Sequence, residues 1–542
     1  MGVAQMVAGN LPGRCVSWFE GKRQGLRVIH LSPEAKRSQG PSGLGLAVEA
    51  LVSGLNGIKN FPAVVVRPSF GEKILSNDGE LLGEIDVINP IDDEEMSFSL
   101  AFDLSSDGVP YLNIQKSDDP YFFRGVSTGG GVKALSTYNR DSFSDQGKEL
   151  SQPALVLNLV FARIAELFST CTDKKNDLIV HGHDHLTALA ILLAHKSGLR
   201  TMYTVHNNRF RSLESKDQIS KMGISIEGLN PLSYREILGS RTRDKTFLDL
   251  FQIIARDANY VTTVSPSYAR MLSKEPHENC FYALSSQDRF SGIQNGLPQR
   301  FLNLSSNRHA QDEPSSTIRA LLSHRFDPTK GYSFLTDKMV LNRLDFLTTA
   351  FTGTGIKGPG LVFDIIASDG DPEIKRELVT SQKLVNESYP NTFKMQDYSE
   401  GALIEALTKS DLALHLSRQE PCGLFAMLAQ AAGCIPLVTP EGGLEDVVGK
   451  KTDIFSSSFV ISRKYGFAFP YYALSIGNIW KAIISTAGFI RQNSLQIQAM
   501  RQRMVEHARE FYKPERVAAE YAALYEQISL ASKTGPSLQT NL

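Results

Sequence analysis

Residues 418–438, RQEPCGLFAMLAQAAGCIPLV, combine a glutamate, a cysteine and a glycine just ahead of a helix-like run of small residues. The pattern predicts a strand, a loop and then a helix that begins near Gly423 and Leu424. Backbone N–H groups at such a start, together with the helix dipole, favour an anion. Glu420 lies beside this positive end, where it could accept hydrogen bonds from ligand hydroxyl groups. An ordinary helix start with an acid in its first turn has the same local pattern, so both interpretations stay open here.

Two further stretches favour a ligand site. In RFDPTKG, Arg325 and Lys330 stand five residues apart after the apolar run ALLSH. An arginine fork and a lysine point charge at one strand end suit a diphosphate, although most such residues are merely solvated. In PEGGLEDVV, Gly442 and Gly443 permit a tight turn beside a ligand.

The stretch HGHDH offers a different chemistry. His181, His183 and His185 alternate along one face of a predicted strand, which could chelate zinc. No fourth ligand stands at a suitable spacing, so we predict no metal here and a polar cluster at a strand end instead. Cys422 has no histidine partner nearby in sequence, which favours a buried packing role over a nucleophile.

Strand-like and helix-like segments alternate over most of the chain and must position these residues. Clear strand candidates are LRVIHLS, DLIVHGH, LRTMYTV, NYVTTV, LVFDIIA, LALHLS and CIPLV. The alternation predicts an α/β protein whose parallel sheets are covered by helices on both faces. In such folds ligands bind at the carboxyl ends of the strands, where the residues above are found. Residues 66–150 are less regular and are interpreted as insertions and hairpins, and residues 304–316 as an exposed loop.

The composition limits the kinds of partner and the cellular compartment that we expect. The 542 residues carry 57 Lys and Arg against 58 Asp and Glu, so no bulk positive charge indicates a nucleic-acid partner. Five scattered cysteines without CxxC spacing favour a reducing compartment. We see neither a signal-peptide pattern nor an apolar run long enough to span a membrane, and therefore expect a cytoplasmic protein.

Several motifs, in this order, resemble those of the glycogen and bacterial starch synthases, a family of GT-B glycosyltransferases. The resemblance runs from about residue 27 to about residue 528. The motifs of the second half are Arg325 with Lys330 and Gly331, EPCGL at 420–424, GGLxD at 442–446 and GFxF at 466–469. Those of the first half are HxHD at 181–184, TVHN at 204–207, VTTVSPSYA at 261–269 and IQNG at 293–296.

The resemblance implies two Rossmann-like parallel-sheet domains that face a central cleft. Residues 25–285 would form an acceptor-side domain with insertions near 66–150. Residues 286–490 would form the nucleotide-sugar domain, and residues 491–542 helices that pack back on the first domain.

The implied activity is retaining transfer of glucose from a nucleotide diphosphate glucose, with ADP-glucose favoured, to an α-1,4-glucan. No cofactor is implied, because the nucleotide sugar is a substrate. The implied catalytic residues are Glu420, His206, Arg325, Lys330 and Asp184. The implied donor-binding residues are Gly43, Leu44, Asn295, Cys422, Gly423, Leu424, Gly442 and Gly443.

The sequence departs from the family pattern in its first loop. The family's Lys-Thr-Gly-Gly-Leu-x-Asp aligns with residues 40–46, where Gly43 and Leu44 match but the lysine, the first glycine and the aspartate do not. This departure bears on the donor and on polymer synthesis rather than on the fold. Two alternatives therefore remain: a GT-B enzyme with another donor or acceptor, such as a sucrose-type sugar, a lipid or a protein, and a catalytically degenerate relative that binds glucan or nucleotide.

Overall fold

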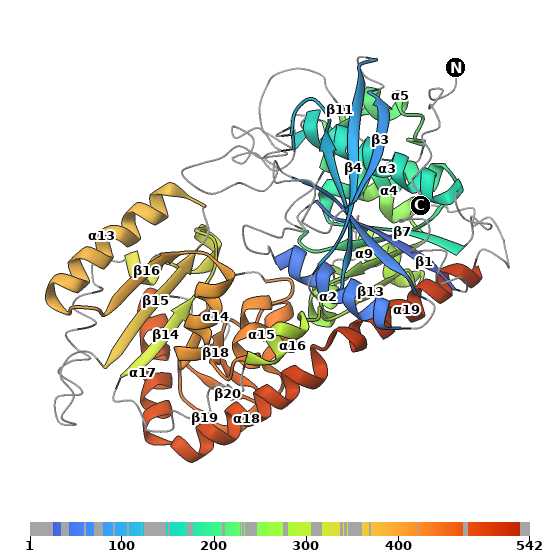
Figure 1. Cartoon of the computed structure of the whole chain (residues 1–542). Coiled ribbons are helices and arrows are strands. Elements are labelled where there is room, and N and C mark those ends of the chain that lie inside the picture. The colour runs from blue at the N-terminus through green and yellow to red at the C-terminus, as the bar shows by residue number, and fades with distance from the viewer. Residues whose placement is uncertain are drawn as a thin grey trace.

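The chain is described from a computed structural model, which contains two large sheets in two lobes (Figure 1). The residues that it describes are 25–33, 43–58, 61–69, 80–89, 93–105, 108–120, 122–123, 148–149, 152–170, 177–208, 212–227, 229, 232–233, 246–274, 280–304, 317–336, 340, 344, 360–367, 370–418, 420–469 and 475–531. The loop predicted at 304–316 lies outside this set, apart from residue 304.

The first sheet has nine strands, and its central part is parallel. Neighbours run parallel from β13 to β5, while β4 and β3 add an antiparallel edge. This edge belongs to the less regular region between residues 66 and 150. In spatial order the strands are β13 (Phe290–Gly292), β12 (Tyr260–Thr263), β8 (Arg200–Val205), β7 (Leu178–His183), β1 (Arg27–Leu31), β2 (Ala63–Pro68), β5 (Pro110–Lys116), β4 (Glu95–Leu104) and β3 (Glu80–Ile88).

Both faces of the parallel central part of the first sheet are buried, which explains why its strands read as continuous apolar runs, whereas β3 at the edge alternates buried and exposed residues. Along β1, Ile29 packs into one hydrophobic cluster and Val28 into another on the opposite face. The first cluster contains residues of α3 (Gln152–Thr170), α4 (Ala188–Lys196) and α7 (Leu250–Asp257). The second contains residues of α2 (Gly43–Gly57) and α19 (Pro514–Ala531).

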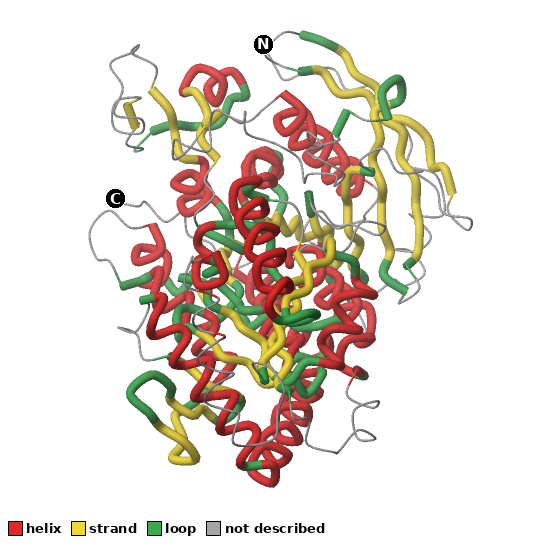
Figure 2. The backbone as a smooth tube through the Cα atoms, turned by 90° about the vertical axis from the view of Figure 1, so that its left-hand side faces the viewer, coloured by secondary structure: helices red, strands yellow, loops and turns green. Residues whose placement is uncertain are grey.

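The second sheet has eight strands, of which β16 to β21 are parallel neighbours. Figure 2, seen from the side of this lobe, shows helices flanking the strands. In spatial order the strands are β16 (Phe393–Asp397), β15 (Leu361–Ala367), β14 (Ile318–Leu322), β17 (Leu412–His415), β18 (Ile435–Val438), β21 (Gly466–Ala468), β20 (Ile461–Arg463) and β19 (Lys451–Ser456). The longer helices of this part are α13 (Pro372–Ser388), α14 (Glu400–Lys409), α15 (Leu424–Ala431), α17 (Ile476–Gln492) and α18 (Ser494–Phe511).

Shorter elements complete the described part. A small sheet has the order β10 (Leu232–Ser233), β11 (Thr246–Asp249), β9 (Ser212–Ser215) and β6 (Lys148–Glu149). The short helices are η3 (His185–Thr187), α5 (Lys216–Lys221), α8 (Pro266–Leu272), α9 (Cys280–Ser286), α10 (Gln299–Leu302), η5 (Pro328–Lys330), α11 (Ser333–Thr336) and α16 (Gly443–Val448). Together with the two large sheets, these elements confirm the predicted α/β class.

The last helix joins the two lobes. After α17 and α18 of the second lobe, α19 returns to the first lobe and lies along α2 (Figure 1). The helices are so close that a Cβ atom on Gly54 would lie 2.2 Å from the carbonyl oxygen of Pro514. Val517 and Ala518 of α19 share a core cluster with Val48 of α2.

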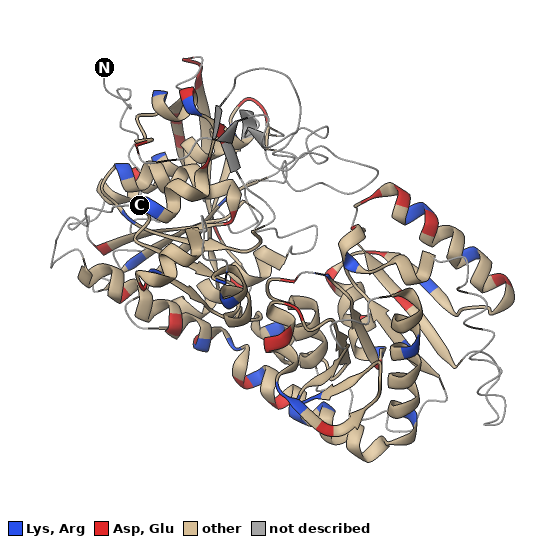
Figure 3. Cartoon of the chain, turned by 180° about the vertical axis from the view of Figure 1, so that it is seen from behind, with Lys and Arg blue, Asp and Glu red and all other residues tan. Residues whose placement is uncertain are grey.

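The charged surface carries no single dominant sign. Figure 3 shows Lys and Arg interspersed with Asp and Glu on both lobes, in keeping with the balanced composition. None of the helices in the described ranges combines the length and the apolarity needed to cross a membrane.

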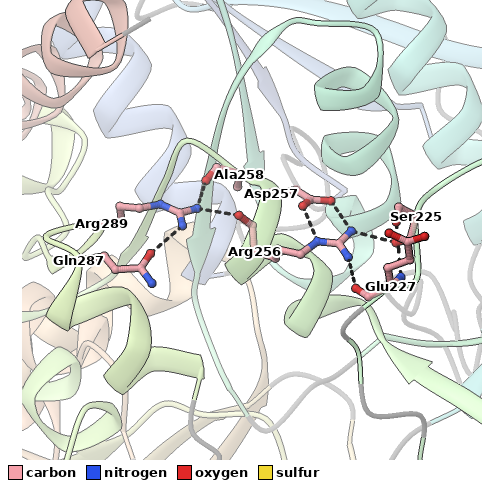
Figure 4. A network of polar contacts seen from close by, with 7 residues as sticks. All are labelled: Ser225, Glu227, Arg256, Asp257, Ala258, Gln287 and Arg289. Atoms are coloured by element: carbon pink, nitrogen blue, oxygen red, sulfur yellow. Dashed lines mark hydrogen bonds and ion pairs between the residues drawn. The ribbon is translucent and has the colours of Figure 1, made fainter. Parts of the chain in front are cut away.

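A network of hydrogen bonds and ion pairs surrounds the carboxyl end of α7 (Figure 4). Arg256 binds Asp257 through two N–H groups at 2.6 and 2.8 Å. Arg289, just before β13, donates to the carbonyl oxygens of Arg256 and Ala258. These carbonyls lie at a helix end, where the helix itself supplies no partner for them.

We expect Arg289→Ala to lower the free energy of unfolding by about 2 kcal/mol, because it removes charge-assisted hydrogen bonds from partly buried carbonyl groups. Urea unfolding measures this loss. Arg376→Ala on the exposed face of α13 is the control and is expected to change the unfolding free energy by less than about 0.5 kcal/mol. Equal stability of Arg289→Ala and the unmodified protein would contradict this assignment.

Candidate active site

Lys330 and Glu420, predicted from separate motifs, meet in the second lobe. The strands β14 and β17 are parallel neighbours, so their carboxyl ends lie at the same edge of the sheet. Lys330 Nζ, in the turn after β14, lies 2.7 Å from Glu420 Oε2, in the loop after β17. Their side chains are only 18% and 14% exposed. The geometry therefore forms a partly buried ion pair at a strand-end position.

His415 completes this pair and was missed in the sequence. Its Nε2 lies 3.0 Å from the same Glu420 Oε2, and its side chain is 2% exposed. Burial by itself would raise the pKa of Glu420, but the charge of Lys330 and the contacts with His415 hold that pKa well below its usual range. Glu420 is therefore a carboxylate in this environment. The available signal was a histidine as the last residue of a buried strand, five positions before the motif glutamate.

A second histidine, His324, packs against His415 with the ring planes tilted by 53°. The ring centroids lie 4.4 Å apart, and Phe425 meets His324 edge-on at 5.0 Å. Burial lowers the pKa of His324 well below 6.5, and the neighbouring His415 and Lys330 lower it further, while Glu420 acts in the opposite direction. His324 is therefore neutral at pH 7.

This neutrality makes stability depend on pH. Below the ordinary histidine pKa of about 6.5, the unfolded chain binds a proton at His324 that the folded protein does not, so stability falls as the pH falls. Between pH 7.5 and 5.5, we expect His324 to lower the free energy of unfolding by about 1 kcal/mol. In urea unfolding at both pH values, His324→Phe should lose correspondingly less stability on acidification than the unmodified protein. An identical pH dependence for both proteins would show that His324 does not contribute.

The helix after Glu420 is preceded by Gly423, whose backbone conformation favours glycine. Gly423 has φ 87° and ψ 36°, a left-handed conformation, and a Cβ atom there would lie 2.8 Å from Leu444. Leu424 is the first residue of α15. Cys422 is buried, and burial raises the pKa of its thiol. Asn295, in the segment that joins the lobes, is also buried and makes hydrogen bonds to this cysteine.

The glycine pair of the GGLxD motif packs on the backbone of the Glu420 loop. The Gly443 N–H donates to the Glu420 carbonyl at 2.8 Å. A Cβ atom on Gly442 would lie 2.4 Å from the Glu420 carbonyl oxygen, and one on Gly443 2.4 Å from that of Pro421. The two glycines thus hold the loop that carries Glu420.

The same motif links the lobes. Asp446 accepts hydrogen bonds from the Ser267 N–H at 2.7 Å and from the Ser267 hydroxyl at 2.6 Å. Ser267 lies in the first turn of α8, in the first lobe. The Ser265 hydroxyl donates to the Pro421 carbonyl at 2.7 Å. The serines of the SPSYA segment therefore fasten the Glu420 loop to the first lobe.

The first-lobe candidates Asp184 and His206 lie at neighbouring strand ends. Asp184 follows β7 with a positive φ of 65° and ψ 174°, and His206 follows β8. Burial lowers the pKa of His206 to about 4, while the nearby Asp184 acts to raise it. His183 Nδ1 lies 3.1 Å from His206 Nε2, which gives His206 a fixed neighbour.

Gly43 and Leu44 begin α2 and lie close to the second lobe. A Cβ atom on Gly43 would be 3.1 Å from Leu424 Cδ1, so the starts of α2 and α15 approach each other across the lobes. Leu44 itself is buried in the cluster with α19. The remainder of the predicted loop, residues 40–42, lies outside the described residues.

Arg325 is placed at the rim of this site. Its side chain is 50% exposed, and its guanidinium lies 3.8 Å from Asp327. It follows β14 by three residues, at the same sheet edge as Lys330. The structure therefore brings Lys330 into contact with Glu420, and it packs Gly442 and Gly443 on the backbone of the Glu420 loop. Arg325 lies beside this group.

Comparisons with known proteins agree with this arrangement. Residues 27–282 match the family model of the starch synthase catalytic domain. A glycogen synthase of Deinococcus deserti is 29% identical over 289 residues, which are 50% of this chain and 59% of the relative. A glycogen synthase of Chlamydia caviae is 26% identical over 296 residues, 50% of this chain and 60% of the relative. The chain thus spans less than two thirds of the length of these curated relatives.

Solved structures match over nearly the whole chain. The catalytic domain of starch synthase IV from Arabidopsis thaliana, bound to ADP and acarbose, superimposes with a TM-score of 0.71. The match covers 94% of this chain and 100% of that one at 19% identity. This chain has the GT-B fold and resembles the starch synthase catalytic domain over residues 27–282. The predicted resemblance and the predicted pair of Rossmann-like parallel sheets are thereby confirmed.

The chain also shares its fold with enzymes of other specificity. An α,α-trehalose-phosphate synthase (UDP-forming) from Burkholderia vietnamiensis has a TM-score of 0.54 at 10% identity, covering 95% of this chain and 100% of that one. Likeness at such low identity shows the architecture alone. The donor and the acceptor must be argued from the site.

Proposed function

We propose that this chain is a retaining glycosyltransferase that moves glucose from a nucleotide diphosphate glucose, ADP-glucose by preference, to an α-1,4-glucan. The observation that carries the proposal is the Lys330–Glu420 ion pair at the carboxyl ends of β14 and β17. The match to the starch synthase catalytic domain supports this reaction class.

Lys330 and Arg325 would stabilise the leaving diphosphate. An ammonium group has three N–H donors, and only one is needed for Glu420. The remaining donors can meet phosphate oxygens as negative charge grows on them during bond cleavage. Arg325 at the rim and the start of α15 at Gly423 and Leu424 would add to this positive environment. Because the protein supplies the charge, the proposal needs no cofactor.

Glu420 would hold the sugar. Both Lys330 and His415 contact its Oε2, so in this proposal Oε1 accepts hydrogen bonds from the glucose hydroxyl groups. The carboxylate also stabilises the positive charge that the ring gains as the glycosidic bond breaks. His206 and Asp184, from the first lobe, would orient the sugar and the acceptor.

Release of nucleoside diphosphate tests the proposal. The purified protein is incubated with ADP-glucose or UDP-glucose, each with and without glycogen. Release from one donor that requires glycogen is the expected result and identifies that donor. No release from either donor by folded protein would overturn the proposal.

A second candidate is a GT-B enzyme with another donor or acceptor, such as a sucrose-type sugar, a lipid or a protein. The observation that favours it is the loop at 40–46, which lacks the lysine and the aspartate of the family motif. Release that does not depend on glycogen would favour this candidate. A degenerate relative would bind ADP or UDP in calorimetry without any turnover.

A further inference from the structure

Four histidines, three of them buried and His206 partly buried, form a continuous group at the carboxyl edge of the first sheet. His30 is the last residue but one of β1, His181 and His183 lie on the adjacent β7, and His206 follows β8. Strand register explains the grouping, because His30 is the direct partner of His181 in the parallel pair β1 and β7. His30 was not part of the histidine set predicted from sequence. The structure replaces His185 with His30 as the third member.

Three of these rings are placed like metal ligands. Ligand nitrogens of His30, His181 and His183 all lie within 4.8 Å of one another, and the three residues are 0–1% exposed. His30 Nδ1 is 2.9 Å from His183 Nε2. Two imidazoles bound to one tetrahedral zinc ion at about 2.0–2.1 Å have nitrogens about 3.3 Å apart. To share an ion, the His30 and His183 nitrogens would separate by about 0.4 Å, and nitrogens of the trio that lie as far as 4.8 Å apart would approach by up to about 1.5 Å.

We propose that His30, His181 and His183 bind a divalent transition-metal ion, of which zinc is the best match. Three neutral imidazoles are a zinc ligand set that leaves the fourth position for water. The rings fit this role by position, because all three are buried and their nitrogens face one another at one edge of the sheet.

Outer contacts would orient two of the three ligands, His181 and His183, whereas His30 Nε2 is buried without a hydrogen-bond partner. Metal-bound histidines generally use their second nitrogen in a hydrogen bond. His183 Nδ1 faces His206 Nε2 at 3.1 Å. His181 lies 2.8 Å from the Tyr525 hydroxyl through Nδ1 and 2.7 Å from the Thr204 hydroxyl through Nε2. Whichever nitrogen binds the ion, the other therefore keeps a hydroxyl partner. If Thr204 is displaced, its hydroxyl retains Thr262 at 2.6 Å.

The ion would also act on the proposed sugar site, a consequence that rests on the proposed function. An ion on His183 Nε2 leaves the proton on Nδ1, which then donates to His206 Nε2. The proton of His206 is thereby fixed on its Nδ1. The metal would thus position His206 without touching the sugar.

The test measures metal directly and does not depend on turnover. The full chain is produced in medium supplemented with zinc, washed with chelator and analysed for metal by mass spectrometry, then prepared with cobalt for visible spectroscopy. We expect about one ion per chain and the absorption of a tetrahedral cobalt site. His30→Phe should lower the metal affinity at least about a hundredfold. His185→Phe, the neighbouring histidine outside the trio, should retain the ion.

Two results would overturn the proposal: zinc-free protein after zinc supply, or equal metal content in His30→Phe and the unmodified chain. If His30→Phe does not fold, X-ray absorption of the zinc-loaded unmodified protein decides instead. Three imidazole ligands are expected there, and any other ligand set contradicts the assignment. If the unmodified chain held the metal but transferred no glucose, the proposed function would be contradicted and the metal site would stand.

Discussion

Lys330→Ala is expected to lower kcat for glucosyl transfer at least about a hundredfold, the usual effect of losing one donor to a developing negative charge. Two effects act together. The leaving diphosphate loses the ammonium group, and Glu420 loses the partner that lies 2.7 Å away. Because burial favours the neutral acid, the pKa of Glu420 rises once this charge is gone. Diphosphate release from the preferred donor in the presence of glycogen measures the change.

A surface ion pair provides the matched control for Lys330→Ala. Lys409 lies 2.6 Å from Glu405 on α14, and both side chains are more than 60% exposed. Lys409→Ala is expected to leave kcat unchanged, because solvent screens such pairs. If Lys330→Ala retained kcat within about threefold while remaining folded, Lys330 would not act on the diphosphate. Calorimetry with ADP and UDP then shows whether it contributes to nucleotide binding instead.

The pairing of Lys330 with Glu420 could be anticipated because both residues follow strands. Apolar runs and glycine-marked turns identify strand ends locally, and parallel strands bring such ends to one edge. The motif residue Gly442 was also found in this way, whereas Asp446 was identified only through the resemblance of the GGLxD motif. The contacts of these motif residues were not predicted. The glycine turn stays a prediction as a ligand neighbour, and its packing on the Glu420 carbonyl was not anticipated.

The histidine contacts could not be predicted, for a physical reason. His30 and His183 are 153 residues apart, and they meet only because β1 pairs with β7. Local periodicity shows that a segment is a strand but not which strand lies next to it. The same limit hid the ring contact between His324 and His415, since each looks like an isolated histidine near a strand end. Interactions that depend on strand order require the fold.

The glycine contacts lead to the second large effect. Gly442→Ala is expected to lower the free energy of unfolding by about 2–5 kcal/mol. Gly442 has φ 55° and ψ −128°, a conformation that alanine adopts only with strain. The added Cβ atom would also lie 2.4 Å from the Glu420 carbonyl oxygen, and backbone cannot move aside as a flexible side chain can. Turnover should fall with stability, because relief of the clash displaces the loop that carries Glu420.

The same substitution elsewhere separates strain from the mere addition of a methyl group. Gly488 lies within α17, and a Cβ atom there meets nothing within 4 Å. Gly488→Ala is therefore expected to raise the unfolding free energy by about 0.5–1 kcal/mol, since alanine favours helix and restricts the unfolded chain. Urea unfolding of both variants should give changes of opposite sign. A small change at Gly442 would show that the Glu420 loop is not held by this turn, and Glu420 would then have to be positioned by Lys330 and His415 alone.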